Sequence, residues 1–377
     1  MKYTTPALLT ASLALLGANP AAAAIDGDIA GDGYGPARAV QGVQTQFGDN
    51  FSELNAAYAK FQGGNLNLAL TGNIENNFNK VIIFIDSVAG GQSTIDPLNN
   101  PANFDSLIGD GFANAWESNL GNTVFDVGFE PDYVMIARRG SGKFDFDFAA
   151  MNQTAVAADE FTDAFLGFEE GASGPLVGVN GTFEVGYDNS NVAGVAGGEG
   201  PADQVAALAV TTGLELSIPL SSLGNPNGAI KVTAWVTGGN YSFNSNQYLA
   251  SLELEDFDED PLTDPTRGNV GEFYDISVLP GTQFFTIVNG DTDGDGDIDD
   301  SDLGTAFSNY TGPLAPGTGG KDVGDGDTDG DGDVDDSDLG TAFSGYTGPL
   351  GPAAVPEPTS LALLSLGGLM IARRRRA

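Results

Sequence analysis

The chain has 377 residues, with 52 acidic against 14 basic side chains and a net charge of −38 at neutral pH. It contains no cysteine, which excludes disulfides, and no histidine, which removes the commonest general base and the usual zinc ligand. So acidic a surface repels phosphate and therefore argues against nucleic acid and anionic lipid as partners.

Residues 1–24 are typical of a secretory signal peptide. They contain Lys2, an apolar run from Ala7 to Leu16 and a small-residue exit at Ala22-Ala23-Ala24. A buried apolar helix is the alternative, but the order of charge, apolar run and alanines favours a signal. We therefore predict cleavage after Ala24 and export through the inner membrane.

Residues 25–288 have the pattern of short strands separated by glycine-rich turns. Four segments carry this pattern most clearly: Leu66–Leu70, Val81–Ile85, Phe144–Phe148 and Leu214–Leu220. Val81–Ile85 is continuously apolar and suits a central strand, whereas the proline in the last segment favours an edge or a strand end. Many strands with turn signals between them predict a single β-sandwich domain.

Three phrases of this region resemble the family-9 carbohydrate-binding modules and their DOMON-like relatives. They are Ile25–Asp28, the phrase TGLELSIPLSSLG from Thr212 to Gly224, and the late strand IKVTAWVTG from Ile230 to Gly238. The resemblance spans residues 25–250 and implies a β-sandwich, for which sugar binding is an open question. Members of that family grip sugar chiefly between tryptophans, and this chain has Trp116 and Trp235.

Trp235 is the candidate glycan contact. Period-two geometry places Ile230, Val232, Ala234 and Val236 on one face of the strand and Lys231, Thr233 and Trp235 on the other. An exposed indole on that polar face would stack on a sugar ring. The alternative is that a loop or the aromatic residues Tyr241 and Phe243 cover it. Trp116 has no readable face.

No catalytic signature is present, and we name no catalytic residue. Glycosidases need two carboxylates at a fixed separation, which the sequence alone cannot locate among so many acids. The candidates Asp159, Glu160, Glu169 and Glu170 lie near expected turns and have the pattern of solvated acids. We therefore predict a non-catalytic protein; the alternative is a subunit of a polysaccharide-degrading system, either a glycoside hydrolase or its binding partner.

Near the C-terminus a calcium-loop pattern occurs twice, 36 residues apart. The copies read DTDGDGDIDDSDL from Asp291 and DTDGDGDVDDSDL from Asp327. An EF-hand loop offers oxygens at positions 1, 3, 5, 7, 9 and 12 and has glycine at 6, which here is Gly296 or Gly332. The predicted ligands, two Ca²⁺ ions in all, are Asp291, Asp293, Asp295, Asp297, Asp299 and Asp302 in the first copy and Asp327, Asp329, Asp331, Asp333, Asp335 and Asp338 in the second. Position 7 normally binds through its carbonyl and position 9 through water.

Each loop is followed by an apolar stripe at helical spacing. The stripe consists of Leu303, Ala306, Phe307 and Tyr310 in the first copy and of Leu339, Ala342, Phe343 and Tyr346 in the second. Gly312 and Gly348, each before a proline, are the expected stops. No comparable helix precedes either loop, so the unit is loop–helix. We expect Ile298 and Val334 to form a short bridge between the paired loops.

This duplicated loop–helix unit, with Asp at position 12, resembles the type I dockerin module over residues 289–350. The resemblance implies that Asp300, Ser301, Asp336 and Ser337 meet a cohesin-like partner. These residues differ from the Ser-Thr pairs common in cellulosome dockerins. An intramolecular calcium staple is an equal alternative, and a disordered acidic spacer is the simplest one. We expect the module to fold when it binds calcium.

The C-terminus resembles the PEP-CTERM sorting signal of bacteria that use an exosortase. Val355–Thr359 contains the motif Pro356, Glu357 and Pro358, and is followed by the apolar run Leu361–Ala372 and by Arg373–Arg376. The run is short for a stable membrane span, and the arginines would hold it on the cytoplasmic side. The resemblance implies that an exosortase removes the tail; a permanent membrane anchor is the alternative.

The predicted organisation therefore has four parts: 1–24 signal peptide, 25–288 β-sandwich, 289–350 small α dockerin-like module and 351–377 sorting signal with a hydrophobic helix. We expect a mainly β, exported protein of the cell surface or extracellular matrix that binds calcium and acts in adhesion or glycan binding.

Overall fold

The computed structural model describes residues 24–96, 119–151, 168–169, 176–180, 183–198, 200–241, 244–250, 275–278, 281–314 and 319–348. Several sequence predictions lie outside these ranges: the signal peptide up to residue 23, Trp116, Asp159, Glu160, Glu170, Phe243, and the sorting motif Pro356–Pro358 with its hydrophobic helix.

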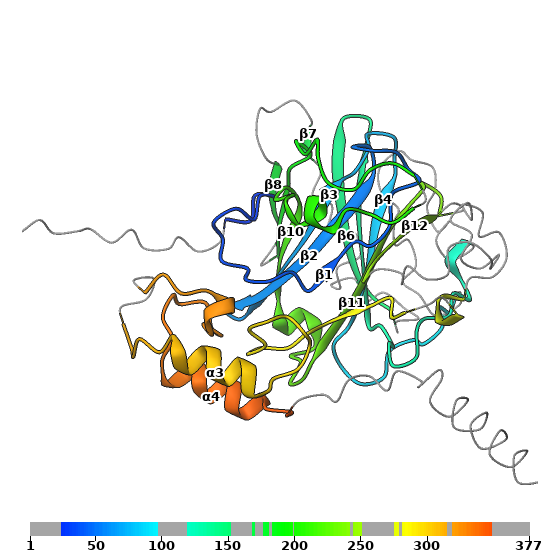
Figure 1. Cartoon of the computed structure of the whole chain (residues 1–377). Helices are drawn as coiled ribbons and strands as arrows, with labels where there is room; N and C mark the ends of the chain where they lie inside the picture. Colours follow the sequence, from blue (N-terminus) through cyan, green and yellow to red (C-terminus); the bar gives the residue numbers. More distant parts are fainter. Residues whose placement is uncertain are drawn as a thin grey trace, which may run out of the picture.

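The described residues are mainly β and form two antiparallel sheets (Figure 1). The first sheet has six strands in the order β1-β2-β3-β10-β9-β8. Their bounds are β1 Ala39–Val40, β2 Glu53–Gln62, β3 Asn65–Asn73, β10 Gly213–Pro219, β9 Phe183–Tyr187 and β8 Leu176–Asn180. A two-residue turn, Gly63-Gly64, joins β2 to β3, and both glycines have positive φ, as the tightest hairpin turns require.

The second sheet has the order β12-β11-β4-β5-β6-β7, with β13 paired to β11 beside this path. Its strands are β12 Asn244–Leu249, β11 Ile230–Thr237, β4 Lys80–Asp86, β5 Tyr133–Gly140, β6 Lys143–Ala150, β7 Phe168–Glu169 and β13 Phe285–Ile287. Short helical turns connect the strands: α2 Gln204–Leu208, η1 Leu220–Leu223 and η3 Ile276–Val278.

The two sheets pack face to face around one core, because alternate residues of their strands point inward. Leu66, Leu68 and Leu70 of β3 contribute from the first sheet, and Phe144, Phe146 and Phe148 of β6 from the second. The predicted period of two is thus confirmed in both strands. Pro219 ends β10 and so removes no internal ladder bond from a strand that lies between β3 and β9.

The second sheet is covered on both faces, which explains why β4 is continuously apolar. Val81, Ile83 and Ile85 enter the core between the sheets, whereas Ile82 and Phe84 belong to a second cluster on the outer face. β4 lies between β11 and β5, as the prediction of a central strand requires. A strand buried on both sides has no need of polar residues at alternate positions.

Trp235 lies in this outer cluster, and its proposed role as an exposed sugar contact is wrong for this conformation. The strand faces are as predicted, with the even-numbered residues from Ile230 to Val236 inward and Trp235 outward. The indole is nonetheless fully buried, stacks on Phe84 at 5.2 Å between ring centroids and donates from Nε1 to Asn244 Oδ1 at 3.0 Å. Tyr241 of the following turn is in the same cluster, so the covered alternative holds.

The C-terminal part is a pair of loop–helix repeats at one end of the sandwich (Figure 1). Helix α3 spans Asp300–Ser308, η4 spans Val323–Asp325 and α4 spans Asp336–Gly345. Both α-helices end before the predicted stops at Gly312 and Gly348, which adopt positive φ three or four residues later. No helix within the described ranges combines the length and apolar character that crossing a bilayer requires.

Ile298 and Val334 are buried, but they do not bridge to each other as expected. The carbonyl of Ile298 accepts from the Thr347 amide at 3.0 Å, and that of Val334 accepts from the Thr311 amide at 2.9 Å. Each loop is therefore tied to the segment after the helix of the other repeat. The short segments after the helices, Asn309–Thr311 and Tyr346–Thr347, reach across to the other loop, which the bridge prediction left out.

Replacing Trp235 by alanine is expected to lower the free energy of unfolding by about 3–5 kcal/mol, because it empties a fully buried site and orphans Asn244. Chemical denaturation followed by far-UV circular dichroism measures this. The matched control is Phe51→Ala, which removes a side chain that is 55% exposed and should change stability by less than about 1 kcal/mol. A stable Trp235→Ala variant that loses polysaccharide binding would contradict the structural role.

Candidate metal centre

The two acidic loops have the same backbone shape, which their glycines permit. Gly296 and Gly332, at position 6, have φ of 94° and 91°. Gly294 and Gly330, at position 4, have φ of 86° and 75°. Residues other than glycine rarely adopt this left-handed backbone conformation. The glycines at these positions therefore allow each loop to curl tightly around one point.

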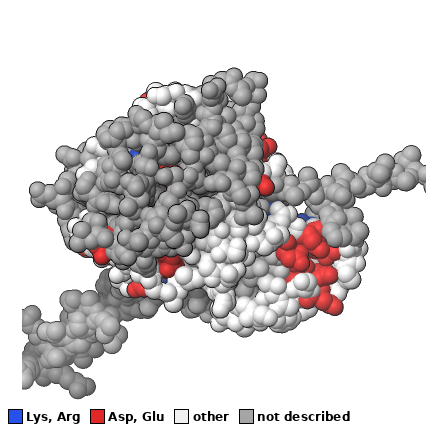
Figure 2. All heavy atoms as spheres, turned by 180° about the vertical axis from the view of Figure 1, so that it is seen from behind, with Lys and Arg blue, Asp and Glu red and all other residues white. Residues whose placement is uncertain are grey.

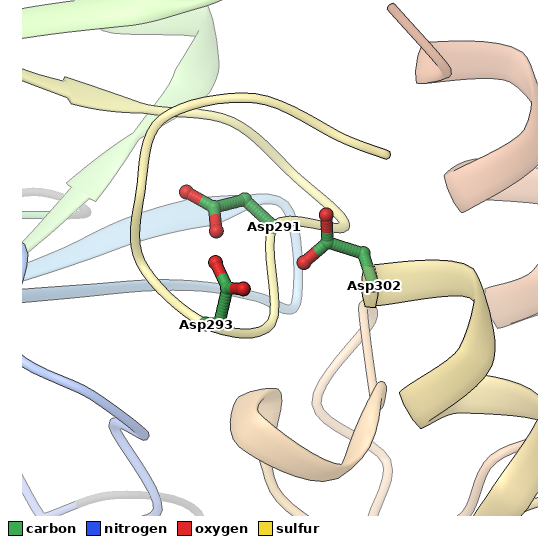
Figure 3. A group of neighbouring side chains, drawn as sticks. All are labelled: Asp291, Asp293 and Asp302. Carbon is green, nitrogen blue, oxygen red and sulfur yellow. The ribbon is translucent and has the colours of Figure 1, made fainter. Parts of the chain in front are cut away.

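Three carboxylates of the first loop converge on that point (Figure 3). Asp291 and Asp293 come from the loop and Asp302 from the first turn of α3, and one oxygen of each lies within 4.8 Å of the others. The second loop repeats the arrangement with Asp327, Asp329 and Asp338. The spacing of the sequence pattern thus brings together positions 1, 3 and 12 in both copies.

A second triplet in each loop joins positions 7, 9 and 12. These groups are Asp297, Asp299 and Asp302 in the first copy and Asp333, Asp335 and Asp338 in the second. Asp295 and Asp331 at position 5 belong to neither kind of group within the described residues; each instead accepts the amide of position 7, at 3.2 and 3.1 Å. The structure therefore gathers ten of the twelve predicted ligands into compact clusters.

Asp302 and Asp338 also accept hydrogen bonds within their own loops, which the calcium pattern does not predict. Asp302 Oδ1 accepts from the amide and hydroxyl of Thr292 at 2.7 and 2.9 Å, and its Oδ2 accepts from the Asp299 amide at 2.8 Å. Asp338 makes the equivalent bonds with Thr328 and Asp335. Asp299 and Asp335 in turn cap the helices, so D-x-x-D at 299–302 and 335–338 forms a capping box.

Position 1 of each loop is buried and turned onto the loop's own backbone. Asp291 accepts from the amides of Gly294 at 2.7 Å and Gly296 at 3.0 Å, and Asp327 accepts from those of Gly330 at 2.7 Å and Gly332 at 2.8 Å. Asp291 also pairs with Arg38 of the sandwich, Nη1 to Oδ2 at 2.8 Å, which nothing in the sequence pattern indicates. A pair of residues so far apart in sequence leaves no local signal.

Burial raises the pKa of the carboxyls at positions 1 and 3 of both loops. It raises the pKa of Asp327 to about 6, with the neighbouring Asp338 and Asp329 adding to the effect and the loop amides opposing it. Desolvation also raises the pKa of Asp291, although Arg38 opposes the shift. The exposed carboxyls Asp293 and Asp329 have raised pKa values through partial burial and the charges of their neighbours. Bringing these acids together is therefore unfavourable unless a cation offsets their charge.

These residues fit a hard divalent cation. Every side chain in the clusters offers carboxylate oxygen, which Ca²⁺ and Mg²⁺ prefer, and no softer ligand is near because the chain lacks histidine and cysteine. Asp333 supplies an independent sign: its Oδ1 is buried and accepts no hydrogen bond from the described residues, while its Oδ2 accepts from the Leu314 amide at 2.6 Å. A buried oxygen without a donor is costly unless a cation satisfies it.

The surface around the clusters is strongly acidic. Residues 289–348 contain sixteen aspartates and one lysine. In Figure 2 acidic atoms gather on the side of the molecule where the two repeats lie. Such a field concentrates cations near the loops and repels polyanions.

The predicted apolar stripe of the helices is only partly buried. Ala306, Leu339 and Ala342 pack inside the module, whereas Phe307 and Phe343 are each 53% exposed and meet edge to face at 5.7 Å between centroids. Tyr310 Oη donates to Asp336 Oδ1 at 2.9 Å and Tyr346 Oη to Asp300 Oδ1 at 2.8 Å. Within the two helices the buried apolar positions are thus Ala306, Leu339 and Ala342, and the aromatic positions lie outside.

The fold and the clusters together define a β-sandwich followed by a paired acidic loop–helix module. Comparison with protein families adds the export signal: residues 354–376 match the PEP-CTERM protein-sorting motif, which contains the predicted Pro356, Glu357 and Pro358. This motif implies export and a C-terminal sorting or anchor region at the cell surface, and exosortase-type processing enzymes recognise it. Neither the curated proteins nor the solved structures include a match to this chain.

If the second cluster holds calcium as predicted, its affinity is expected to fall as the pH drops below about 6, because Asp327 would have to lose its proton before it binds metal. Below that pH the affinity of the second loop should fall by up to about tenfold per pH unit for one displaced proton. Calcium titration calorimetry from pH 5 to 8, repeated in buffers of different ionisation enthalpy, measures both affinity and proton release.

In the absence of calcium, protonation of Asp327 is expected to stabilise the folded state. The folded pKa of Asp327 is raised above 3.8, so between about pH 4 and 6 the folded state binds more protons than the unfolded state, and acidification stabilises it. Calcium affinity that is constant from pH 5 to 8 would contradict the assignment of Asp327 as a ligand.

Proposed function

We propose that the chain is an exported, non-catalytic protein of the cell surface or extracellular matrix whose C-terminal module binds two Ca²⁺ ions and acts in adhesion. The observation that carries this proposal is the pair of triplets, Asp291–Asp293–Asp302 and Asp327–Asp329–Asp338, built alike in both repeats. The sorting motif at residues 354–376 supplies the export half of the proposal. Extracellular calcium is abundant enough for loops of this kind to be filled.

Calcium acts here as a staple between the module and the sandwich. Both loops contact the sandwich side: Arg38 pairs with Asp291, and Gln62 at the end of β2 donates to the Gly330 carbonyl at 2.9 Å. The chain before β1 also lies against the module, since a Cβ on Gly35 would come within 3.0 Å of the Gly324 amide. Ordering the second loop with metal therefore supports the contacts of Gln62 and Gly35 with the module, which hold the start and the end of the described chain together.

The staple is favoured over docking to a cohesin-like partner. In the dockerin resemblance Asp300 and Asp336 meet the partner, but here both carboxylates already accept from tyrosines of the opposite repeat. Ser301 and Ser337 remain exposed. Glycan binding loses its main support because Trp235 is buried, so adhesion through the acidic, calcium-loaded surface is the reading that the described residues support best.

Removing calcium with a chelator is expected to unfold the module and leave the sandwich folded. Sixteen aspartates against one lysine repel one another once the ions leave, and metal binding energy is then lost as folding energy. The prediction is a loss of helical signal in far-UV circular dichroism that calcium restores, with two ions bound per chain by calorimetry. The matched control is the double variant Asp293→Asn with Asp329→Asn, which should bind weakly and respond little. Identical spectra with and without calcium would overturn the proposal.

Processing at the sorting motif is expected to remove the arginine-rich end. Intact-mass spectrometry of the protein isolated from the native cell surface should show a C-terminus upstream of Arg373. The variant with Pro356, Glu357 and Pro358 replaced by alanine is the control and should keep its full tail. Wild-type surface protein that ends at Ala377 would contradict processing and favour a permanent anchor.

A further inference from the structure

We propose that Arg38 makes the two calcium loops unequal: its guanidinium lowers the calcium affinity of the first loop and couples that site to the β-sandwich. The inference rests on the proposed calcium function and assigns a regulatory residue to it. The loops differ in sequence only at position 8, Ile298 or Val334, a position whose side chain is buried in the module in both copies. A difference in metal binding must therefore come from outside the loops.

Most of their internal hydrogen bonds also match; the second loop adds a bond from the Asp331 amide to Asp327 Oδ1 at 3.2 Å. The bonds from Thr292 to Asp302 Oδ1, at 2.7 and 2.9 Å, are repeated from Thr328 to Asp338 Oδ1, at 2.7 and 3.0 Å. The amides of Asp299 and Asp335 each bond the position-12 carboxylate at 2.8 Å. Two sites with the same ligand residues and nearly the same internal bonds would bind Ca²⁺ with similar affinity if nothing else touched them.

The sandwich, however, places the cationic side chain of Arg38 against the first loop and the neutral amide of Gln62 against the second. Arg38 Nη1 lies 2.8 Å from Asp291 Oδ2, and its Nη2 donates to the Asp291 carbonyl at 2.9 Å, with both side chains almost fully buried. In the second loop Gln62 donates to the Gly330 carbonyl, and Asp327 accepts from loop amides. Lys60 also interacts electrostatically with Asp327, but its ammonium group donates a hydrogen bond to the carbonyl of Asp32.

The backbone of Arg38 is held by the sandwich and not by the loop. Its backbone amide donates to the Ala57 carbonyl at 2.8 Å, next to the β1–β2 pairing, so the guanidinium is delivered by the sandwich. The ion pair is shielded from water and therefore only weakly screened by salt. The guanidinium neutralises part of the first ligand and repels the divalent ion that shares it.

The size of the effect follows from Coulomb's law. A single and a double positive charge roughly 6 Å apart lower the affinity by about tenfold even at the dielectric constant of water, and by more in the interior. The coupling is reciprocal: an ion in the first loop weakens the Arg38–Asp291 pair by the same factor. The second loop thus fills first and holds the module together, while the first loop reports on its contact with the sandwich.

The decisive experiment compares two matched variants of the exported chain by calcium titration calorimetry. Asp293→Asn disables the first loop and Asp329→Asn the second, and both residues are exposed, so the fold should tolerate either change. We expect the site left in Asp329→Asn to bind Ca²⁺ about tenfold more weakly than the site left in Asp293→Asn. Equal affinities would overturn the inference while leaving the calcium function intact.

Substitution of Arg38 then tests the cause. Arg38→Gln added to Asp329→Asn should tighten binding about tenfold, whereas added to Asp293→Asn it should change nothing. Arg38→Lys keeps the charge and should keep the first site weak. Weaker binding in Arg38→Gln would mean that the guanidinium positions Asp291 for the ion, and would also overturn the inference. A wild-type chain that takes up no calcium at millimolar concentration would overturn the proposed function and this inference together.

Discussion

The crowding of like charge at the C-terminal end is the constraint on which the rest of the module depends. Its loops turn carboxylates inward, where burial raises their pKa values, and the backbone amides of the same loops offset only part of this cost. In the proposed function a positive charge or a proton that enters each cluster offsets the remaining cost. Calcium, the guanidinium of Arg38 and acid would each supply such a charge, and they would therefore compete for the same carboxylates.

The β-sandwich is held mainly by apolar burial. Its second sheet is buried on both faces, with β4 sending side chains into two separate apolar clusters. Apolar burial of this kind depends little on ions or pH. In the proposed function the chain therefore joins a part held mainly by apolar packing to a part that folds with metal, and the contacts of Arg38 and Gln62 lie where the two meet.

Much of this could be predicted from the sequence, because the strongest signals are local. The period of two in β6 and β11, the apolar run of β4 and the glycines at position 6 of the loops each follow from a few neighbouring residues. The convergence of Asp291, Asp293 and Asp302 follows from the same spacing.

What could not be predicted depends on residues far apart in the chain. The exposure of Trp235 depends on which residues cover the outer face of its sheet. The sequence of its own strand does not indicate those residues. The Arg38–Asp291 pair and the crossed bonds of Ile298 and Val334 join segments that only the folded chain brings together. The capping box at residues 299–302 also has a local sequence signal. Asp299 and Asp302 belong at the same time to the calcium-loop pattern, and they are predicted from the sequence only as calcium ligands.

The crossed bonds also bear on how such a module can arise. A lone repeat would leave the backbone groups of Ile298 and of Thr311 without the partners that the sister repeat provides. A solitary ancestor would thus have had to assemble as a pair of identical chains, and gene duplication followed by fusion turns that assembly into one polypeptide. Once joined, the halves can diverge in their surroundings while their ligands stay the same, and a guanidinium beside one half is a difference of that kind.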